Sequence, residues 1–320
     1  MSLQHALIAI LADGEFHSGT ALGQHLDVSR NAVWKALQHL QALDIDVHAV
    51  HGKGYRLAEP LELLDSQGIE SLLSEQSRNS LHSLDVLFDV DSTNAWLLRQ
   101  PRRHAVACLA ERQHSGRGRR GRDWISPFAA NLYLSMGWQF ETSASSLGSM
   151  SLVVGVAIVR GLQALGIEGL SLKWPNDIYC QGRKLGGILI EMRGESGGPS
   201  ELVIGVGINI HMPTSVEDSI TQPWIDLRHC HGVSRNRVAA SVIDALVDAC
   251  LRCSEGESSQ YLQEWERLNE FAGQTVVLHM PDGKTLEGRC TGIDENGALL
   301  LEHNGATQSF HCGEVSLRGT

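Results

Sequence analysis

The hydrophobic positions of the first 40 residues recur every three or four residues, which predicts three short helices. In the third helix, Val33, Leu37 and Leu40 form the inward face, and Ser29 stands where an N-cap is expected. Residues 46–50 and 55–57 then have strand character on either side of a basic, glycine-rich tip, His51-Gly52-Lys53-Gly54. Helices followed by such a hairpin predict a winged helix-turn-helix over residues 1–60.

The outward side of the third helix and the hairpin tip carry residue types that contact DNA in this motif. The candidates are Arg30, Asn31, Trp34, Lys35, Gln38 and Lys53. Residues 18–57 hold four Lys or Arg residues against three Asp residues, so their local charge is only +1. We therefore expect a single copy to bind DNA weakly. A small helical domain that merely packs is the alternative interpretation.

The rest of the chain changes its pattern twice. Residues 61–83 have the character of a mostly helical connector, and residues 84–271 mix strand and helix signals. Strands are expected over residues 84–89, 105–110, 131–137, 185–191 and 202–208, and helices over residues 94–98, 148–165, 236–253 and 259–270. After Gly273, short strands alternate with turn signals such as Asn304-Gly305. A small antiparallel β-barrel over residues 272–320 would complete an α+β protein.

Composition agrees with a cytoplasmic protein. With 320 residues and 42% hydrophobic content, the chain has enough material for two or three domains with cores of their own. Its most apolar stretch, residues 147–159, is shorter than the ~20 residues that cross a bilayer, so no membrane association is expected. The N-terminus lacks a basic, apolar signal peptide. An odd number of cysteines, seven, favours reduced thiols.

Residues 116–122, Gly-Arg-Gly-Arg-Arg-Gly-Arg, are the strongest chemical signal, and we call them the Arg loop. They fit the dinucleotide-binding pattern G-x-G-x-x-G, but the following Trp124-Ile125-Ser126-Pro127-Phe128 does not have helical character. Glycines interleaved with cations instead predict a loop that closes over an anion and is mobile when empty. A solvated basic loop or a nucleic-acid tract is the alternative for the loop taken alone.

Three further segments accompany the Arg loop. Asp91-Ser92-Thr93-Asn94 joins an expected strand to an expected helix, and Lys173-Trp174-Pro175-Asn176-Asp177 places an amide beside a carboxylate. Arg183-Lys184-Leu185-Gly186-Gly187 puts a lysine at the start of a strand. In this order the segments resemble those of the biotin–protein ligases. With the N-terminal domain included, the resemblance covers essentially the whole chain and is to the bifunctional bacterial form, a biotin operon repressor and ligase in one chain.

The resemblance implies a central mixed α/β ligase domain of the class II synthetase type and an SH3-like C-terminal barrel. It implies activation of biotin with ATP and Mg²⁺ to biotinoyl-5′-AMP, and transfer of biotin to a lysine of the biotin carboxyl carrier protein of acetyl-CoA carboxylase. It also implies a homodimer, promoted by biotinoyl-5′-AMP as corepressor, that binds the operator DNA of biotin biosynthesis genes. No metal site made by protein alone is expected.

The chemistry explains the residue types. A carboxylate that attacks the α-phosphate of ATP meets another anion, so the site has to offset that repulsion. Arginine supplies bidentate donors and lysine a point charge. The resemblance implies that biotin is bound by Ser92, Thr93, Asn94, Gln113, Arg117, Gly118, Arg119 and Lys184. It implies that the nucleotide is bound by Arg117, Arg119, Arg122, Trp124, Asn176 and Asn209, with Trp124 stacked on adenine. Lys184, Arg119 and Asp177 are the expected catalytic residues.

Several alternatives stay open at this point. Ser92 has a second interpretation as a helix N-cap, Trp124 as a core tryptophan, and Lys184 as an exposed lysine at a strand start. Asp177 either positions the attacking lysine amine or shares in binding Mg²⁺. Trp34 departs from the polar residue of the best-known family members at its position, so the DNA sequence that the helix reads does not carry over. A ligase with a vestigial N-terminal domain, a non-catalytic ligand-sensing repressor and a lipoate ligase are the competing functions, although the Arg loop favours biotin.

Overall fold

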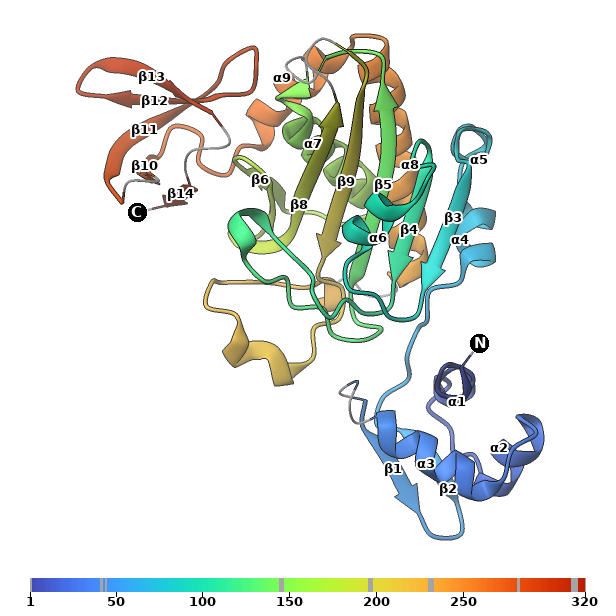
Figure 1. Cartoon of the computed structure of the whole chain (residues 1–320). Coiled ribbons are helices and arrows are strands. Elements are labelled where there is room, and N and C mark those ends of the chain that lie inside the picture. The colour runs from blue at the N-terminus through green and yellow to red at the C-terminus, as the bar shows by residue number, and fades with distance from the viewer. Residues whose placement is uncertain are drawn as a thin grey trace.

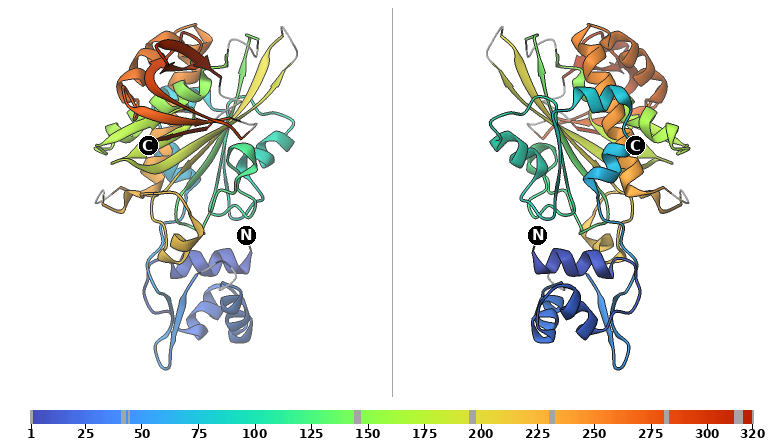
Figure 2. Two further views of the ribbon diagram at one scale, coloured as in Figure 1. Left: turned by 90° about the vertical axis from the view of Figure 1, so that its left-hand side faces the viewer. Right: turned by 90° about the vertical axis from the view of Figure 1, so that its right-hand side faces the viewer.

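The computed structural model describes residues 2–40, 43, 45–143, 147–194, 198–229, 233–280, 283–311 and 316–319. Figure 1 shows three parts: a helical N-terminal part with a hairpin, a central sheet with helices, and a small C-terminal sheet. The two terminal parts lie at different ends of the central sheet, which the side views confirm (Figure 2). The predicted α+β architecture is confirmed.

The N-terminal part is the predicted winged helix-turn-helix. Its elements are α1 (Leu3–Leu11), α2 (Gly19–His25), α3 (Arg30–Leu40), β1 (Val47–Val50) and β2 (Gly54–Leu57). Ser18 caps α2 through Ala21 N, and Ser29 accepts from Ala32 N at the start of α3. Val33, Leu37 and Leu40 are buried against α1, as the periodicity predicts. Strands β1 and β2 form the antiparallel wing.

The predicted connector holds two short helices, α4 (Ser66–Leu72) and α5 (Glu75–Ser80). A buried polar network holds its first residues to the central part. Glu62 accepts from Ser234 Oγ, from Arg235 N and from the Asn236 side chain at the start of α8. These hydrogen bonds outweigh the effect of burial, which by itself would raise the pKa of Glu62, so the net pKa of this carboxyl lies below its usual value.

A seven-stranded sheet forms the centre, in the order β3-β4-β5-β9-β8-β7-β6. All neighbours are antiparallel except the parallel pair β3 and β4. The strands are β3 (Ser83–Leu87), β4 (Val106–Ala110), β5 (Leu132–Phe140), β6 (Leu170–Lys173), β7 (Asp177–Cys180), β8 (Arg183–Gly194) and β9 (Ser200–Ile208). The helices are α6 (Thr93–Arg99), α7 (Met150–Ala164), α8 (Arg235–Ser254) and α9 (Ser258–Leu268).

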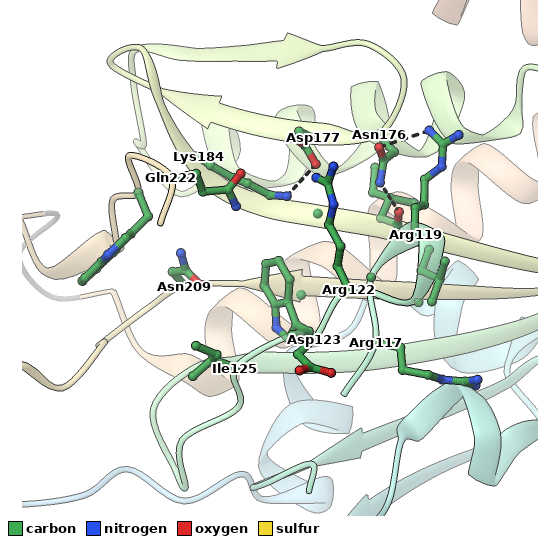
Figure 3. Close-up of a pocket in the computed structure, with 18 of the residues that line it drawn as sticks. Arg117, Arg119, Arg122, Asp123, Ile125, Asn176, Asp177, Lys184, Asn209 and Gln222 are labelled. Atoms are coloured by element: carbon green, nitrogen blue, oxygen red, sulfur yellow. Dashed lines mark hydrogen bonds and ion pairs between the residues drawn. The ribbon is translucent and has the colours of Figure 1, made fainter. Parts of the chain in front are cut away.

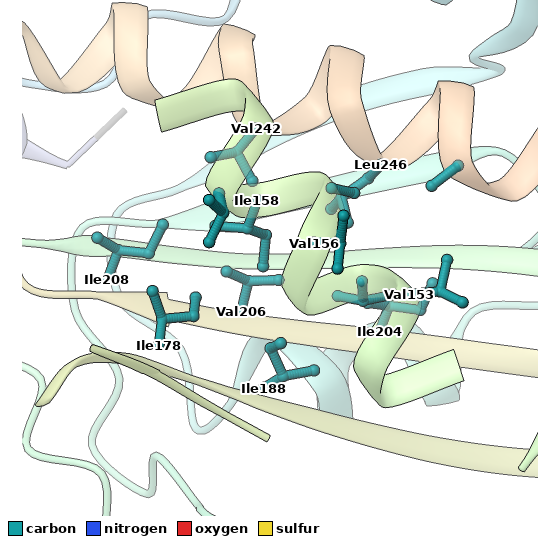
Figure 4. Close-up of a cluster of buried hydrophobic side chains, with 14 of the residues drawn as sticks. Val153, Val156, Ile158, Ile178, Ile188, Ile204, Val206, Ile208, Val242 and Leu246 are labelled. Carbon is teal, nitrogen blue, oxygen red and sulfur yellow. The ribbon is translucent and has the colours of Figure 1, made fainter. Parts of the chain in front are cut away.

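The apolar core lies on one face of this sheet. Helix α7 packs between the sheet and α8, so that its side chains meet strand residues on one side and Val242 and Leu246 of α8 on the other (Figure 4). Strand β9 alternates along its length: Ile204, Val206 and Ile208 enter this core, so Gly205 and Gly207 lie on the opposite face. That opposite face carries α6 and the Arg loop.

The C-terminal part is an antiparallel sheet in the order β13-β12-β11-β10-β14. Its strands are β10 (Thr275–His279), β11 (Thr285–Ile293), β12 (Leu299–His303), β13 (Ala306–Phe310) and β14 (Ser316–Gly319). Its turn at Gly297 supports the central part directly, because Trp174 Nε1 donates to Gly297 O at 3.1 Å. Trp174 is almost fully buried, and it immediately precedes the Pro175-Asn176-Asp177 segment of the predicted site.

The N-terminal part contacts the central part through a short aromatic stack. The ring of Phe88 lies 4.6 Å from that of His5 in α1 and 4.9 Å from that of Phe128, which follows the Arg loop. Phe128 and Ala129 thereby join the core of the winged helix-turn-helix. No helix in the described parts of the chain is both long and apolar enough to cross a membrane.

Candidate active site

A pocket of about 1290 Å³ opens on the face of the central sheet opposite α7. Every residue predicted to bind biotin or nucleotide lines it, as does Asp177. These residues come from the start of α6, from residues 113–124 around the Arg loop, from the start of β7 and the residue before it, from β8, and from the residue after β9. The fold brings them together over one stretch of sheet (Figure 3). Their individual roles stay predictions, but their common location is a structural fact.

Glycines make room for the pocket. A Cβ at Gly207 would lie 2.5 Å from Trp124 Cε2, and one at Gly187 would lie 3.3 Å from Trp124 Cζ3. The indole of Trp124 therefore rests on the bare backbone of β8 and β9. Trp124 is therefore part of the pocket wall and is not a core tryptophan. Its Nε1 is buried without a hydrogen-bond partner. An unpaired buried donor in a pocket wall is a position that a ligand acceptor can satisfy.

The start of α6 forms one end of the pocket. Thr93 donates to Gln113 Oε1 through its backbone N at 2.8 Å and its hydroxyl at 3.0 Å, and Gln113 Nε2 donates to Ser126 Oγ at 3.3 Å. Ser92 is the N-cap of α6, so the second interpretation of this residue is correct, although Ser92 also lines the pocket. Short hydroxyls and amides suit a ligand with two N–H donors and one carbonyl.

The carboxylate of Asp91 fixes this corner from outside. It pairs with Arg99 at the far end of α6 at 2.6 Å and accepts from Ser92 N at 2.9 Å. The hydrogen bond from Arg99 holds the pKa of Asp91 down to about 2. The first turn of α6 is thus tied at both ends, which keeps Ser92 and Thr93 in place.

The Arg loop turns back over the pocket without a following helix, which agrees with the rejection of a dinucleotide fold. Gly118 N donates to Arg122 O at 2.7 Å, and Trp124 N donates to Gly116 O at 2.9 Å. Arg119 donates to Asn176 Oδ1 at 3.4 Å, and Asn176 Nδ2 donates to Ile188 O at 2.7 Å. Arg122 extends into the pocket toward Lys184 and Asp177 (Figure 3).

Lys184 is the second residue of β8 and its side chain is only 14% exposed, so it is not a solvated strand-start lysine. Its Nζ lies 2.7 Å from Asp177 Oδ1 and 5.6 Å from the centre of the Trp124 ring. Tyr179, on the adjacent strand, lines the same end of the pocket. Burial, with smaller effects of the Asp177 and Glu270 charges, raises the pKa of Tyr179 to about 12, so its hydroxyl stays protonated.

Sequence reasoning missed the segment from Ser219 to Trp224, which forms another wall of the pocket. It is tied to β8 by the backbone: Lys184 N donates to Pro223 O at 3.2 Å, and Ile225 N donates to Lys184 O at 3.0 Å. Asn209 Nδ2 donates to Ile225 O at 3.1 Å, so one of its amide protons holds this segment. No motif in the sequence marks these residues.

The predicted DNA-contacting residues of α3 share one exposed face. Arg30, Asn31, Trp34, Lys35 and Gln38 are all exposed, and Trp34 shows 48% of its surface to solvent. On the wing, Lys53 lies 5.6 Å and Arg56 5.0 Å from the centre of the Phe16 ring. The sequence prediction included Lys53, whereas Arg56 was counted only in the charge balance.

The pocket is strongly cationic. Its described lining includes four arginines of the Arg loop with Lys173 and Lys184, against the two carboxylates of Asp123 and Asp177. Cations concentrated in a partly enclosed space bind anions well. The described residues hold no cluster of three or more His, Cys, Asp or Glu side chains that fits a metal ion. The fold and the site define a protein that joins a DNA-binding domain to a pocket for an anionic ligand.

The comparisons with known proteins agree with this class. Residues 88–209 match the biotin/lipoate A/B protein ligase family, residues 3–56 a helix-turn-helix domain, and residues 271–318 the biotin protein ligase C-terminal domain. The chain is 45% identical to the bifunctional ligase/repressor BirA of Salmonella typhimurium, over 98% of this chain and 96% of the relative. The protein of that name from Escherichia coli is 44% identical, with the same coverage of each chain. The chain belongs to this family of biotin protein ligases.

A solved structure supports the central and C-terminal fold. The biotin protein ligase from Aquifex aeolicus, in complex with biotin and ATP, superimposes with a TM-score of 0.65 at 27% identity. It covers 75% of this chain and 100% of that chain. The predicted family and architecture are confirmed.

Proposed function

We propose that this protein activates biotin with ATP to biotinoyl-5′-AMP and then transfers biotin to a lysine of a biotin carboxyl carrier protein. The observation that carries the proposal is the position of Lys184 beside Asp177, with the Arg loop lining the same cationic pocket. A sensor without catalysis has no need of a shielded lysine beside the phosphate-binding cations. The names of the relatives, ligase and repressor, support both halves of the function.

In the first step a biotin carboxylate oxygen attacks the α-phosphorus of ATP, a P–O bond forms, and pyrophosphate leaves. Lys184, Arg119 and Arg122 offset the negative charge that gathers on the phosphorus oxygens, and Arg117 closes the loop over biotin. Ser92, Thr93 and Gln113 are placed to recognise the ureido ring. Trp124 lies over the glycine floor, where it is placed to stack on adenine. Asn176 and Asn209 complete the nucleotide end.

Mg²⁺ enters this scheme as the partner of ATP. With two carboxylates in the pocket and one of them already paired with Lys184, phosphate oxygens would supply most of its ligands. In the second step the acceptor lysine amine attacks the acyl carbon and AMP leaves. Asp177 orients that amine in this scheme; the support is its contact with Lys184, the residue to which the scheme assigns the reacting end of biotin.

We also propose that the N-terminal domain makes the protein a repressor of biotin biosynthesis genes, with biotinoyl-5′-AMP as corepressor. Support comes from the exposed face of α3, where Asn31, Trp34 and Gln38 are placed to contact bases and Arg30, Lys35 and Lys53 to contact phosphates. We assign domains to residues 1–60, 84–271 and 272–320, joined by the connector 61–83, and place the protein in the cytoplasm.

Mass spectrometry tests the ligase directly. The purified protein, incubated with biotin and Mg-ATP, should release pyrophosphate and retain biotinoyl-5′-AMP. Addition of a biotin carboxyl carrier domain should then increase that domain's mass by one biotinyl group. Parallel incubation with lipoate is the control, and pyrophosphate release that depends on lipoate and not on biotin would refute the proposal.

A further inference from the structure

Both polar atoms of the Asn94 side chain form hydrogen bonds within the protein. Its Nδ2 donates to Leu189 O at 3.2 Å and to Glu191 Oε2 at 2.8 Å, while its Oδ1 accepts from Ser135 Oγ at 2.5 Å. Two acceptors face the amide nitrogen and a hydroxyl faces the oxygen, which assigns the orientation of the amide. Both N–H groups are therefore used inside the protein. Asn94 is 4% exposed and supports the pocket more than it offers donors to a ligand.

One carboxylate oxygen of Glu191 accepts a hydrogen bond from the buried Asn94 amide, and the other faces the Arg loop. Its Oε1 lies 3.7 Å from Arg117 Nη2, and the two side chains are 30% and 49% exposed. One carboxylate thus touches the rigid floor of the pocket and the loop that closes it. Gly205 allows the Asn94 amide to lie directly against β9, because a Cβ there would collide with that amide.

Because Asn94 is held rigidly, it fixes the position of Glu191 and hence of the contact between Glu191 and Arg117. Asn94 is held by β5 through Ser135, by β8 through Leu189 and by the start of α6. The Arg117 guanidinium therefore meets a carboxylate whose second oxygen is anchored in a buried network. The charge of Glu191 also offsets the repulsion of Arg117 from the other loop cations.

We infer that Glu191 is a positioning residue that sets closure of the Arg loop over bound adenylate, by holding Arg117 while Asn94 holds Glu191. This inference rests on the proposed ligase function. It assigns Glu191 to retention of the adenylate and leaves phosphoryl chemistry to Lys184 and the arginines. Glu191 touches no reacting atom and acts through Arg117.

The Glu191→Gln variant separates the two contacts. A glutamine oxygen still accepts from Asn94, but the ion pair with Arg117 is lost. The release rate of biotinoyl-5′-AMP, measured by pulse-chase, should rise about two- to fivefold, the range for an ion pair at a partly exposed site. The rate of pyrophosphate release in a single turnover, under saturating biotin and ATP, should change by a smaller factor than the rate of adenylate release. Glu191→Ala also removes one of the two acceptors of the Asn94 amide, so the KM for biotin should rise in addition.

Glu201→Gln is the matched control. Glu201 lies on the same sheet, in β9, and its carboxylate pairs with Arg103 at 2.6 Å, but neither residue lines the pocket. This variant should release adenylate at the wild-type rate. Arg117→Gln breaks the proposed contact from the loop side, so Glu191→Gln should add nothing to its effect in the double variant.

Three outcomes are distinguishable. Wild-type protein that makes no adenylate contradicts the proposed function. Wild-type protein that makes adenylate, with Glu191→Gln releasing it no faster than Glu201→Gln, overturns the inference alone. Additive effects of Glu191→Gln and Arg117→Gln also overturn it, because independent residues do not share one contact. Thermal unfolding of each variant shows whether a change in release reflects loss of the fold.

Discussion

Lys184 Nζ lies 2.7 Å from Asp177 Oδ1, and the two residues belong to neighbouring strands, β8 and β7. Both side chains are largely shielded from solvent, at 14% and 17% exposure, so their charges act on each other and on a ligand with little screening. In the proposed mechanism, this ammonium stands where the biotin carboxylate and the α-phosphate meet. Removal of either charge would therefore change the electrostatic potential at this end of the pocket.

Lys184→Ala should slow adenylate formation by about 10²–10³-fold, the effect of removing one preorganised group that stabilises transition-state charge. Part of the loss should come from Asp177, which would then face the phosphates uncompensated. Pyrophosphate release in a single turnover measures this step alone. Arg183→Ala is the control, because Arg183 is the exposed neighbour on the same strand and lies outside the pocket lining. Equal rates for the two variants would contradict the role of Lys184.

Arg119→Gly should act differently, on retention. Arg119 donates to Asn176, which in turn donates to Ile188 O of β8. The substitution of Arg119 therefore removes a contact between the Arg loop and the sheet. We expect adenylate to form and then escape, so that lysines of unrelated proteins nearby become biotinylated without selection. Streptavidin blotting of a mixture with bovine serum albumin measures this labelling. If Arg119→Gly and Lys184→Ala only weakened substrate binding, and by the same factor, the assignment of retention to Arg119 and of adenylate formation to Lys184 would be refuted.

The two glycines of β9 offer a paired test of the pocket's two ends. An alanine at Gly207 would push on Trp124, whereas one at Gly205 would push on Asn94. Overpacking of this kind costs roughly 1–3 kcal/mol, which corresponds to about 5- to 150-fold in affinity if the whole cost falls on binding. Gly207→Ala should raise the KM for ATP more than that for biotin, and Gly205→Ala the reverse. Steady-state kinetics with each substrate varied checks this, and parallel changes in both variants would contradict the assigned ends.

Local patterns predicted much of the fold. The helices α1, α3 and α8 have helical periodicity, α7 is a nearly continuous apolar run of helix length, and β4, β5, β8 and β9 are apolar runs bounded by turns, so their limits fall within a few residues of the expected ones. Strands β6 and β7 were missed because each has only four residues and, unlike the equally short β1 and β2, they are not joined by a glycine-rich tip that marks a hairpin. Such short runs carry too little periodicity to separate a strand from a loop.

The site likewise contains residues that the sequence marks and contacts that it does not reveal. Arg119, Lys184 and Asp177 stand in segments whose composition is unusual, so the sequence marks them. The contact between Asn94 and Glu191 joins residues 97 positions apart and arises because helix α6 packs on the central sheet, which no local pattern reveals. The wall from Ser219 to Trp224 was missed for the same reason, since its place depends on backbone bonds to Lys184.

Repression should require dimerisation. The segment 18–57 has a local charge of only +1, so one copy gains little from the release of counterions from DNA. Two copies on a two-fold symmetric operator would double the phosphate contacts and add their base contacts. We expect sedimentation to show a monomer without ligand and a dimer with biotinoyl-5′-AMP, and operator binding to follow the dimer. Trp34→Ala should weaken operator binding without changing the sedimentation of either form.

The coupling between adenylate and operator should be reciprocal. Phe128 is four residues beyond Trp124, and through Phe88 it stacks toward His5 of the N-terminal domain, so the pocket wall and the DNA-binding domain are in physical continuity. Operator DNA should therefore tighten adenylate binding by the same factor by which adenylate tightens operator binding. Titration of adenylate with and without operator, beside titration of operator with and without adenylate, measures both factors. Depletion of adenylate by the acceptor protein would then release the operator. A protein that stays monomeric with adenylate, or binds operator indifferently to it, would instead be a ligase whose N-terminal domain has no regulatory role.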